Sequence, residues 1–387
     1  MGMSWCFVLS VTLVLILTPS PCKCNGDGFS TCTDYPKCEC NKTTLQCDKV
    51  FNQDTTVFQK FPRELTFINV TGNNFTNKIP RNIFGNCSKD VSYSMNKLVS
   101  LDLSRNNITE IHGKTFHCVP GLETLILSHN EWHINNHTHV FLNLPSLKKL
   151  ILKNAFHEKL NGTLHLVKLA WYLGVKKMKS LEELDLSGNE FWFLPNETHN
   201  AFCALEKIVS LDMSNNLLTD VSICSHVSTL KILNLSSNRL RWLSEELAQN
   251  ITKLSKLETL NLDNNLFQCD CGMIPFYNWL KNDSASRAVQ NKRSLKCTTA
   301  FDTVNEGRPI LELSLDDLVC KRDYYNATGV VVGLLFAVII VMFIVAMYYN
   351  RILLRETWKR CMGKPVTLAL IPQSQGYTTV HNQMRQM

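Results

Sequence analysis

The stretch Leu98-Val-Ser-Leu-Asp-Leu-Ser-Arg-Asn-Asn-Ile108 decides the fold of this chain. Its leucines alternate with other residues, so they point to one side of a short strand while the residues between them point to the other. The same Leu-x-x-Leu-x-Leu-x-x-Asn pattern returns, with degenerate copies included, from residues 65, 98, 122, 147, 181, 208, 230 and 257. One coil cannot bury its leucines, but eight stacked coils build a continuous core and one curved parallel sheet. The repeat therefore predicts an α/β solenoid with an irregular convex side.

An asparagine recurs at the turn that leaves each strand, except in the fourth copy, where Ala155 stands in its place. The side-chain amide of an asparagine can form hydrogen bonds with backbone groups on both sides of it. A row of asparagines can therefore satisfy the backbone N–H and C=O groups of neighbouring coils. We therefore assign these asparagines to structure rather than to chemistry.

Cysteines cluster at both ends of the repeats, where a solenoid needs its core covered. They are Cys32, Cys38, Cys40 and Cys47 upstream, and Cys269, Cys271, Cys297 and Cys320 downstream. With these clusters, the segment from Cys32 to Cys320 resembles the extracellular leucine-rich-repeat family with N- and C-terminal cysteine caps. The run Asn265-Leu-Phe-Gln-Cys-Asp-Cys-Gly-Met-Ile-Pro-Phe-Tyr-Asn-Trp-Leu280 is similar to the cap of Toll-like receptors. The resemblance implies disulfides that join Cys32 to Cys40, Cys38 to Cys47, Cys269 to Cys297 and Cys271 to Cys320.

Four further cysteines lie inside the repeats. Cys203 and Cys224 precede their coils by nearly the same number of residues, so neighbouring coils bring them close and we expect a bridge. Cys87 and Cys118 occupy less equivalent places, where a bridge and two buried thiols are both open. The total of 16 cysteines favours an oxidising compartment.

The two ends of the chain predict secretion and one membrane crossing. Residues 1–24 have the apolar run of a signal peptide, cleaved after Ser20, Cys22 or Cys24, with an uncleaved anchor as the alternative. Residues 329–349 are 21 residues without a charge, about 31 Å as a helix, and a basic flank follows them. We expect a signal peptide at 1–24, an N-terminal cap at 25–64, eight repeats at 65–267, a C-terminal cap at 268–321, a juxtamembrane linker at 322–328, a transmembrane helix at 329–349 and a cytoplasmic tail at 350–387.

The formal charge of +7 comes mostly from this flank, because residues 350–387 hold six Lys or Arg and one acidic residue. Residues 25–349 are nearly balanced, with 33 basic and 32 acidic residues. The net positive charge is thus explained by the basic residues next to the membrane segment, and no nucleic acid is expected as a partner.

Potential N-glycosylation sites, Asn-x-Ser/Thr, agree with this topology, because all twelve precede the apolar segment. They are Asn41, Asn69, Asn74, Asn86, Asn107, Asn136, Asn161, Asn196, Asn234, Asn250, Asn282 and Asn326. Asn69 and Asn234 fall between strand leucines, so a glycan on either would block part of the concave face.

The concave face can be followed through one strand position in each coil, namely Asn69, Asp102, Ile126, Ile151, Asp185, Asp212, Asn234 and Asn261. Six of these are polar, as a solvated face requires, whereas Ile126 and Ile151 are adjacent and apolar. Charged residues border them, and an apolar spot with charged edges is typical of a protein-binding patch. Isolated apolar surface residues are the alternative. Our ligand-binding candidates are Ile126, Ile151, Lys149, Lys153, Glu183 and Asp185.

Two other regions are candidates for function. Residues 157–179 form an insertion that is either a second contact surface or a helix packed on the convex side. Histidines crowd one coil at positions 129, 133, 137 and 139, and metal binding or pH sensing competes there with an ordinary polar loop. The spacing matches no metal-ligand motif, so we predict no metal and no cofactor.

Residues 350–387 are only 38, whereas a Toll/interleukin-receptor domain needs well over about 100. We therefore expect signalling to pass through a lateral partner. Tyr377 to Val380 resembles an endocytic sorting signal, which would allow cycling through endosomes, and Cys361 is a candidate for palmitoylation.

No phosphate loop, His-Glu-x-x-His or Gly-x-Ser-x-Gly motif occurs, so we do not expect an enzyme. The sequence predicts a single-pass type I protein of the plasma membrane that binds a protein or glycoconjugate ligand as a receptor or co-receptor. The resemblance to Toll-like receptors adds innate immune recognition to this expectation. The alternative is a cell-adhesion or matrix-interaction protein, because the fold does not choose between them.

Overall fold

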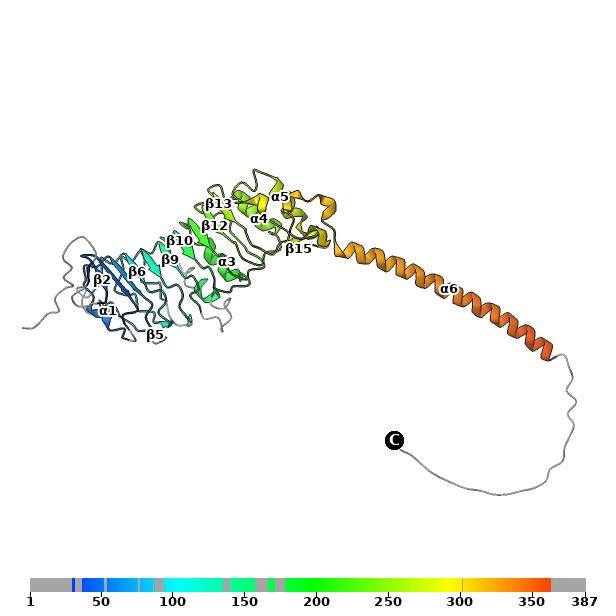
Figure 1. Cartoon of the computed structure of the whole chain (residues 1–387), viewed down its shortest axis with the longest axis horizontal. Coiled ribbons are helices and arrows are strands. Elements are labelled where there is room, and N and C mark those ends of the chain that lie inside the picture. The colour runs from blue at the N-terminus through cyan, green and yellow to red at the C-terminus, as the bar shows by residue number, and fades with distance from the viewer. Residues whose placement is uncertain are drawn as a thin grey trace, which may run out of the picture. The chain divides into compact units, whose positions relative to one another are not determined.

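The structure is a computed structural model of the 387-residue chain, and it describes residues 30–31, 37–51, 54–75, 77–85, 87, 94–134, 140–156, 166–170, 178–300 and 302–362. The chain divides into two compact units, Met1–Cys320 and Lys321–Met387. In the first unit, short strands follow one another along a solenoid, as the blue to green part of Figure 1 shows.

The first unit is built on an 11-stranded sheet in the order β1-β2-β3-β4-β6-β8-β9-β10-β11-β12-β13. Each of the eight predicted repeats supplies one strand, and these strands pair in parallel. They are β4 (Phe67–Thr71), β6 (Ser100–Asp102), β8 (Thr124–Ile126), β9 (Lys149–Ile151), β10 (Glu183–Asp185), β11 (Ser210–Asp212), β12 (Ile232–Asn234) and β13 (Thr259–Asn261). Each strand points a buried leucine or isoleucine into the core. The leucine-rich-repeat solenoid predicted from the sequence is therefore confirmed.

The sheet begins before the first repeat, which the repeat pattern did not predict. Strands β1 (Ser30–Thr31), β2 (Glu39–Cys40) and β3 (Thr44–Asp48) form an antiparallel cap, and β3 then pairs in parallel with β4. Leu45 and Cys47 are buried at the positions that leucines take in the repeats. The N-terminal cap thus continues the core as well as covering it.

The recurrent asparagines join neighbouring coils in the way that the sequence indicates. The side-chain oxygen of Asn189 accepts a hydrogen bond from the backbone N–H of Ala155 at 2.9 Å. Its amide donates to the carbonyl oxygens of Leu152 and Leu186, both at 2.8 Å. Similar side-chain bonds link the coils through Asn73, Asn106, Asn130, Asn216, Asn238 and Asn265. These bonds satisfy backbone groups that the turns would otherwise leave buried and unpaired.

The convex side is irregular. It includes helices α1 (Val57–Lys60), α3 (Asn196–Cys203) and α4 (Glu245–Lys253), and the paired strands β5 (Asn77–Ile79) and β7 (Ile108–Ile111). Helix α4 has an N-cap, because the Ser244 hydroxyl accepts a hydrogen bond from the Leu247 N–H at 3.3 Å. Acidic residues in its first turn and Lys253 in its last turn suit the helix dipole.

The C-terminal cap closes the last coil with aromatic residues. Helix α5 (Ile274–Lys281) buries Phe276 and Leu280, and the Phe276 ring stacks on Phe267 with centroids 5.6 Å apart. The Trp279 indole N–H donates to the Thr252 hydroxyl at 2.9 Å. The rest of the cap holds β14 (Gln268–Cys269), β15 (Thr299–Ala300), and the short helices η2 (Cys271–Met273), η3 (Lys292–Ser294), η4 (Thr303–Asn305), η5 (Ile310–Glu312) and η6 (Leu315–Asp317).

The second unit contains helix α6 (Lys321–Cys361). Among the described residues, only its segment Gly329–Trp358 is long and apolar enough to cross a membrane. The predicted linker at 322–328 is helical and continuous with this segment, because no residue there breaks the helix. The helix also continues past residue 349 into the basic flank.

Candidate functional site

The concave sheet carries one row of side chains in continuous register. Asn69 pairs with Asp102, Asp102 with Ile126, and Ile126 with Ile151. The row continues through Asp185, Asp212, Asn234 and Asn261 on the following strands. The alternation of leucines thus places all eight predicted residues on one line across the sheet.

Most polar members of this row have a structural task. The Asp102 carboxylate accepts a hydrogen bond from the Ser104 N–H at 2.8 Å, two residues later, where the strand ends. Asp185 and Asp212 accept the equivalent bonds at 2.8 Å. Asn234 and Asn261 do the same at 3.2 and 3.0 Å. Each side chain caps the turn of its own coil, as Asp and Asn do in Asx turns.

Ile126 and Ile151 interrupt this pattern, and we call the two together the isoleucine patch. An isoleucine side chain has no acceptor, so these two coils lack the capping bond that five others make. Both side chains are half-buried, and parallel strands place them about 4.8 Å apart. They therefore form one contiguous apolar spot on a polar face, at the cost of two turn caps.

The predicted charged edges of the patch are partly paired with one another. The Lys149 ammonium lies 2.7 Å from the Glu183 carboxylate on the next strand, and Lys148 lies 3.0 Å from Glu123. Lys153 is exposed, and Asp185 is half-buried and bonded to its own turn. Because the ion pairs are exposed to solvent, each contributes only about 0–1 kcal/mol and can open for a ligand.

Two exposed apolar side chains on the same face were missed by the sequence reasoning. Phe67 is 49% exposed and Ile232 is 42% exposed. Both lie at the first position of their strands, two residues before the row that we followed. Comparing the first strand residue of every coil would have revealed them.

The cysteines form the pairs that the resemblance implies, within the described residues. Disulfides join Cys38 to Cys47, Cys269 to Cys297 and Cys271 to Cys320. Cys40 is disulfide-bonded, and its expected partner Cys32 lies outside the described residues. Inside the repeats, disulfides join Cys203 to Cys224 and Cys87 to Cys118. The alternative of two buried thiols at Cys87 and Cys118 is therefore not what the structure holds.

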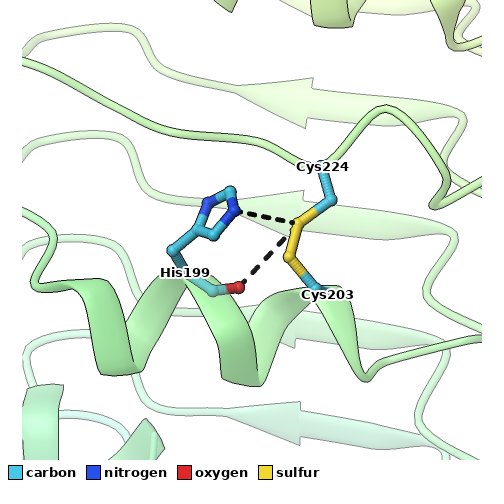
Figure 2. A group of neighbouring side chains, drawn as sticks. All are labelled: His199, Cys203 and Cys224. Carbon is cyan, nitrogen blue, oxygen red and sulfur yellow. Dashed lines mark hydrogen bonds between the residues drawn. A yellow bond between two sulfur atoms is a disulfide. The ribbon is translucent and has the colours of Figure 1, made fainter.

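A histidine lies against one of these disulfides (Figure 2). His199 and Cys203 come from α3, and Cys224 comes from the next coil. The His199 Nε2 lies 3.6 Å from the Cys224 sulfur, and its Nδ1 lies 2.7 Å from the Ser222 hydroxyl. Three potential metal ligands thus meet here. A metal needs thiolates, however, and both sulfurs are used in the disulfide, so the cluster is a structural cross-link in its oxidised form.

The crowded histidines do not gather into a site among the described residues. His129 is exposed with a φ of 55°, and His137 and His139 lie outside the described residues. Partial burial, followed by the positive charges of Arg105 and Lys153, lowers the pKa of His129 below its ordinary value.

The insertion at 157–179 is described only in part. Residues 166–170 are helical, and Leu166, Leu169 and Ala170 are buried. This portion therefore packs against the core, as the convex-helix alternative expects, and residues 157–165 and 171–177 lie outside the description.

The glycosylation sites differ in accessibility. Asn74, Asn107 and Asn282 are exposed, whereas Asn41, Asn69, Asn234 and Asn250 are half-buried. Asn86, Asn136 and Asn161 lie outside the described residues, as do the side chains of Asn196 and Asn326.

On α6, Cys361 is exposed and unpaired among the described cysteines, and Tyr377 and Val380 lie outside the description.

Comparison with known proteins agrees with the fold and the caps. Leucine-rich-repeat family models match residues 63–131 and 180–201. These matches and the disulfides support placing the chain in the extracellular leucine-rich-repeat family with cysteine caps.

Among individual proteins, it is 27% identical to trophoblast glycoprotein of Macaca fascicularis over 331 residues, which cover 81% of this chain and 74% of that protein. It is also similar to the crystal structure of human 5T4 (Wnt-activated inhibitory factor 1, trophoblast glycoprotein), with a TM-score of 0.62 and 26% identity over 73% of this chain and 97% of that one. The chain is thus a leucine-rich-repeat cell-surface protein related to trophoblast glycoprotein.

A shorter match links the chain to Toll-like receptor 3 of Bos taurus, with 30% identity over 120 residues. It covers 31% of this chain and only 13% of that protein. The match therefore spans only a small part of that receptor.

Proposed function

We propose that the chain is a single-pass type I receptor or co-receptor of the plasma membrane, and that it binds a protein or glycoconjugate ligand on the concave face of its solenoid. The observation that carries the proposal is the isoleucine patch. Five other repeats place a turn-capping Asp or Asn at this position, and Ile126 and Ile151 forgo that bond. Two adjacent losses of a turn cap that five other coils keep suit a binding surface.

The surroundings of the patch suit a protein ligand. Apolar anchors at the centre and charged groups at the rim are the usual composition of a protein interface. Here the Lys149–Glu183 ion pair and the exposed Lys153 border the isoleucines. The ligand that fits best presents an apolar side chain to the isoleucines. Charged groups of the ligand would pair with Lys149 and Glu183 in place of their ion pair, and an acidic group would pair with Lys153.

Membrane anchoring supports a role at the cell surface. Gly329–Trp358 is apolar enough to cross a bilayer, and the basic residues that follow it favour a cytoplasmic C-terminus. Transmission through a lateral signalling partner is part of the proposal. A role in innate immune recognition is also part of it, supported by the Toll-like cap motif and the short match to Toll-like receptor 3. Palmitoylation at Cys361 and sorting through Tyr377 and Val380 would adjust its residence at the surface.

A second candidate function follows from the printed name of the solved relative, Wnt-activated inhibitory factor 1. This chain is similar to that protein over 73% of its length, so the second candidate is an inhibitory factor that does not itself transmit a signal. Adhesion to another cell or to matrix is the other alternative, and it predicts partners in trans.

Proximity labelling with the full-length chain tests the proposal. Isolated cells and cells in contact would be labelled with the wild type, with an Ile126→Asp/Ile151→Asn variant, and with an Ile232→Asp control on the same face. A receptor or co-receptor predicts cell-surface partners on isolated cells that the double variant loses and the control keeps. Partners that appear only at cell contacts would favour adhesion, and partners equally labelled by the double variant would exclude the isoleucine patch as the binding site.

A further inference from the structure

Phe67 is an exposed aromatic residue among small polar neighbours. It begins β4, where its register partners are Thr44 on β3 and Ser100 on β6. These short side chains do not cover the ring, which is 49% exposed on the concave face. Since the face is otherwise mostly polar, the open ring offers an isolated apolar surface to which a partner can bind.

A glycosylation site lies next to this ring on the same face. Asn69 follows Phe67 by two residues, and side chains two apart on a strand lie about 6.7 Å from each other on one side of the sheet. The sequence Asn69-Val-Thr71 is an N-glycosylation motif. Asn69 therefore offers a covalent attachment point directly beside the exposed ring.

Asn69 also differs from the other polar residues of its row, because its side-chain amide has no hydrogen-bond partner within the described part of the chain. Strand β4 continues through Thr71, which pairs with Asp48 and donates its hydroxyl to the Asp48 carboxylate at 3.3 Å. No turn begins at Asn69, so its side chain caps nothing, and within the described part of the chain it makes no hydrogen bond.

We propose that Phe67 is the platform on which the first N-acetylglucosamine of an N-linked glycan on Asn69 stacks. One face of this sugar ring is made of C–H groups, whose slight positive charge suits the negative face of an aromatic ring. This proposal rests on the proposed function, because glycosylation requires the solenoid to face the lumen of the secretory pathway, as the type I topology implies.

The second glycosylation motif on the concave face is a natural contrast. Asn234 also follows an exposed apolar residue, Ile232, by two positions. Its amide, however, donates to the Asp212 carboxylate at 3.0 Å, and its oxygen accepts from the Ser236 N–H at 3.2 Å. Isoleucine has no aromatic face for a sugar, so this pair supplies a matched control.

The glycan would border the isoleucine patch. Two strand spacings separate Asn69 from Ile126, which is about 10 Å. A glycan on Asn69 would then form one wall of the ligand site and direct a protein ligand toward the later repeats.

A double-mutant cycle on the full-length glycoprotein, made in mammalian cells, tests this contact. Glycopeptide mapping would first measure occupancy of Asn69 beside that of the exposed site Asn282. Thermal unfolding would then compare the wild type, Phe67→Thr, Asn69→Gln and the double variant, with Ile232→Thr and Asn234→Gln as the control cycle. Phe67→Thr suits the strand, because Thr44 and Ser100 flank the same position.

We expect Asn69 to be occupied, and Asn69→Gln to lower the melting temperature when Phe67 is present but not when it is threonine. Trimming the glycan to its first sugar should leave the effect intact, and the control cycle should be additive. Equal shifts in both backgrounds, or an unoccupied Asn69 beside an occupied Asn282, would overturn the sugar platform alone. An absence of glycans at every site would instead overturn the proposed topology.

Discussion

Ile126 and Ile151 are register partners on the parallel strands β8 and β9, at the position where five other repeats carry an Asp or Asn that caps its own turn. The two residues thus exchange a local hydrogen bond for exposed apolar surface. This exchange separates the stability of the coil from its ability to bind, because a capping residue should suit the coil while removing the patch.

The double substitution Ile126→Asp/Ile151→Asn should therefore leave the solenoid folded. A new turn bond contributes about 0.5–1.5 kcal/mol in each coil, which offsets the loss of strand preference of about 1 kcal/mol. Aspartate is used at position 126 because an asparagine there would create a glycosylation motif with Ser128. Denaturant unfolding of the full-length protein in detergent checks this, and a loss of several kcal/mol would assign the isoleucines to packing instead of binding.

Replacing a ladder asparagine should be far more damaging. Asn189→Ala removes the acceptor of the Ala155 N–H and the donor to the Leu152 and Leu186 carbonyls, all of them buried. Unpaired buried groups cost about 1–3 kcal/mol each, so we expect a loss of about 2–5 kcal/mol in unfolding free energy. The exposed Asn264, with a φ of 57°, is the control, and Asn264→Gly should change stability by less than about 0.5 kcal/mol. Similar losses for both variants would contradict the ladder as the source of the effect.

The disulfide between Cys203 and Cys224 should stabilise the middle of the solenoid. It closes a loop with a sequence separation of 21 residues. Loop-closure entropy then predicts that Cys203→Ala/Cys224→Ala lowers the unfolding free energy by about 3 kcal/mol. Peptide mapping without reduction would verify the bond, and denaturant unfolding would measure the loss. An unchanged midpoint would show that the bond adds nothing beyond the packing of the two coils.

The regular part of the molecule was predictable from the sequence because leucine spacing determines strand register. Ile126 and Ile151 were placed side by side from their positions in the repeat alone, and the structure has them in that register. The polar members of the row were expected to be solvated, whereas five of the six cap turns. That role depends on where each strand ends, which the leucine pattern does not specify.

Features that depend on distances between coils were beyond the sequence. The contact of His199 with the sulfur of Cys224 joins residues that are 25 positions apart and lie in different coils. Their approach follows from repeat lengths and from insertions of irregular shape. Phe67 was missed for a simpler reason, because only one strand position of each coil had been followed.

The last prediction concerns acid pH at the end of the isoleucine patch. The backbone N–H of His129 donates a hydrogen bond to the backbone carbonyl of Lys153 at 2.8 Å, so the histidine lies beside one of the candidate binding residues. Burial, then the charges of Arg105 and Lys153, lowers the pKa of His129 in the folded protein. The unfolded chain titrates near the ordinary value of about 6.5 and therefore binds the proton more readily. Above that pH both states are neutral, and as the pH falls through it, protonation of the unfolded chain destabilises the fold.

We therefore expect the full-length protein to lose stability between neutral and mildly acidic pH, and His129→Asn to reduce this loss. Asparagine tolerates the positive φ of 55° at this position and carries no titrating proton. Melting temperatures of both proteins at the two pH values provide the measurement, with His226→Gln at an exposed site as the control, because asparagine there would create a glycosylation motif with Ser228. An equal acid effect in wild type and His129→Asn would assign the loss to other groups and remove the basis for pH sensing at this end of the patch.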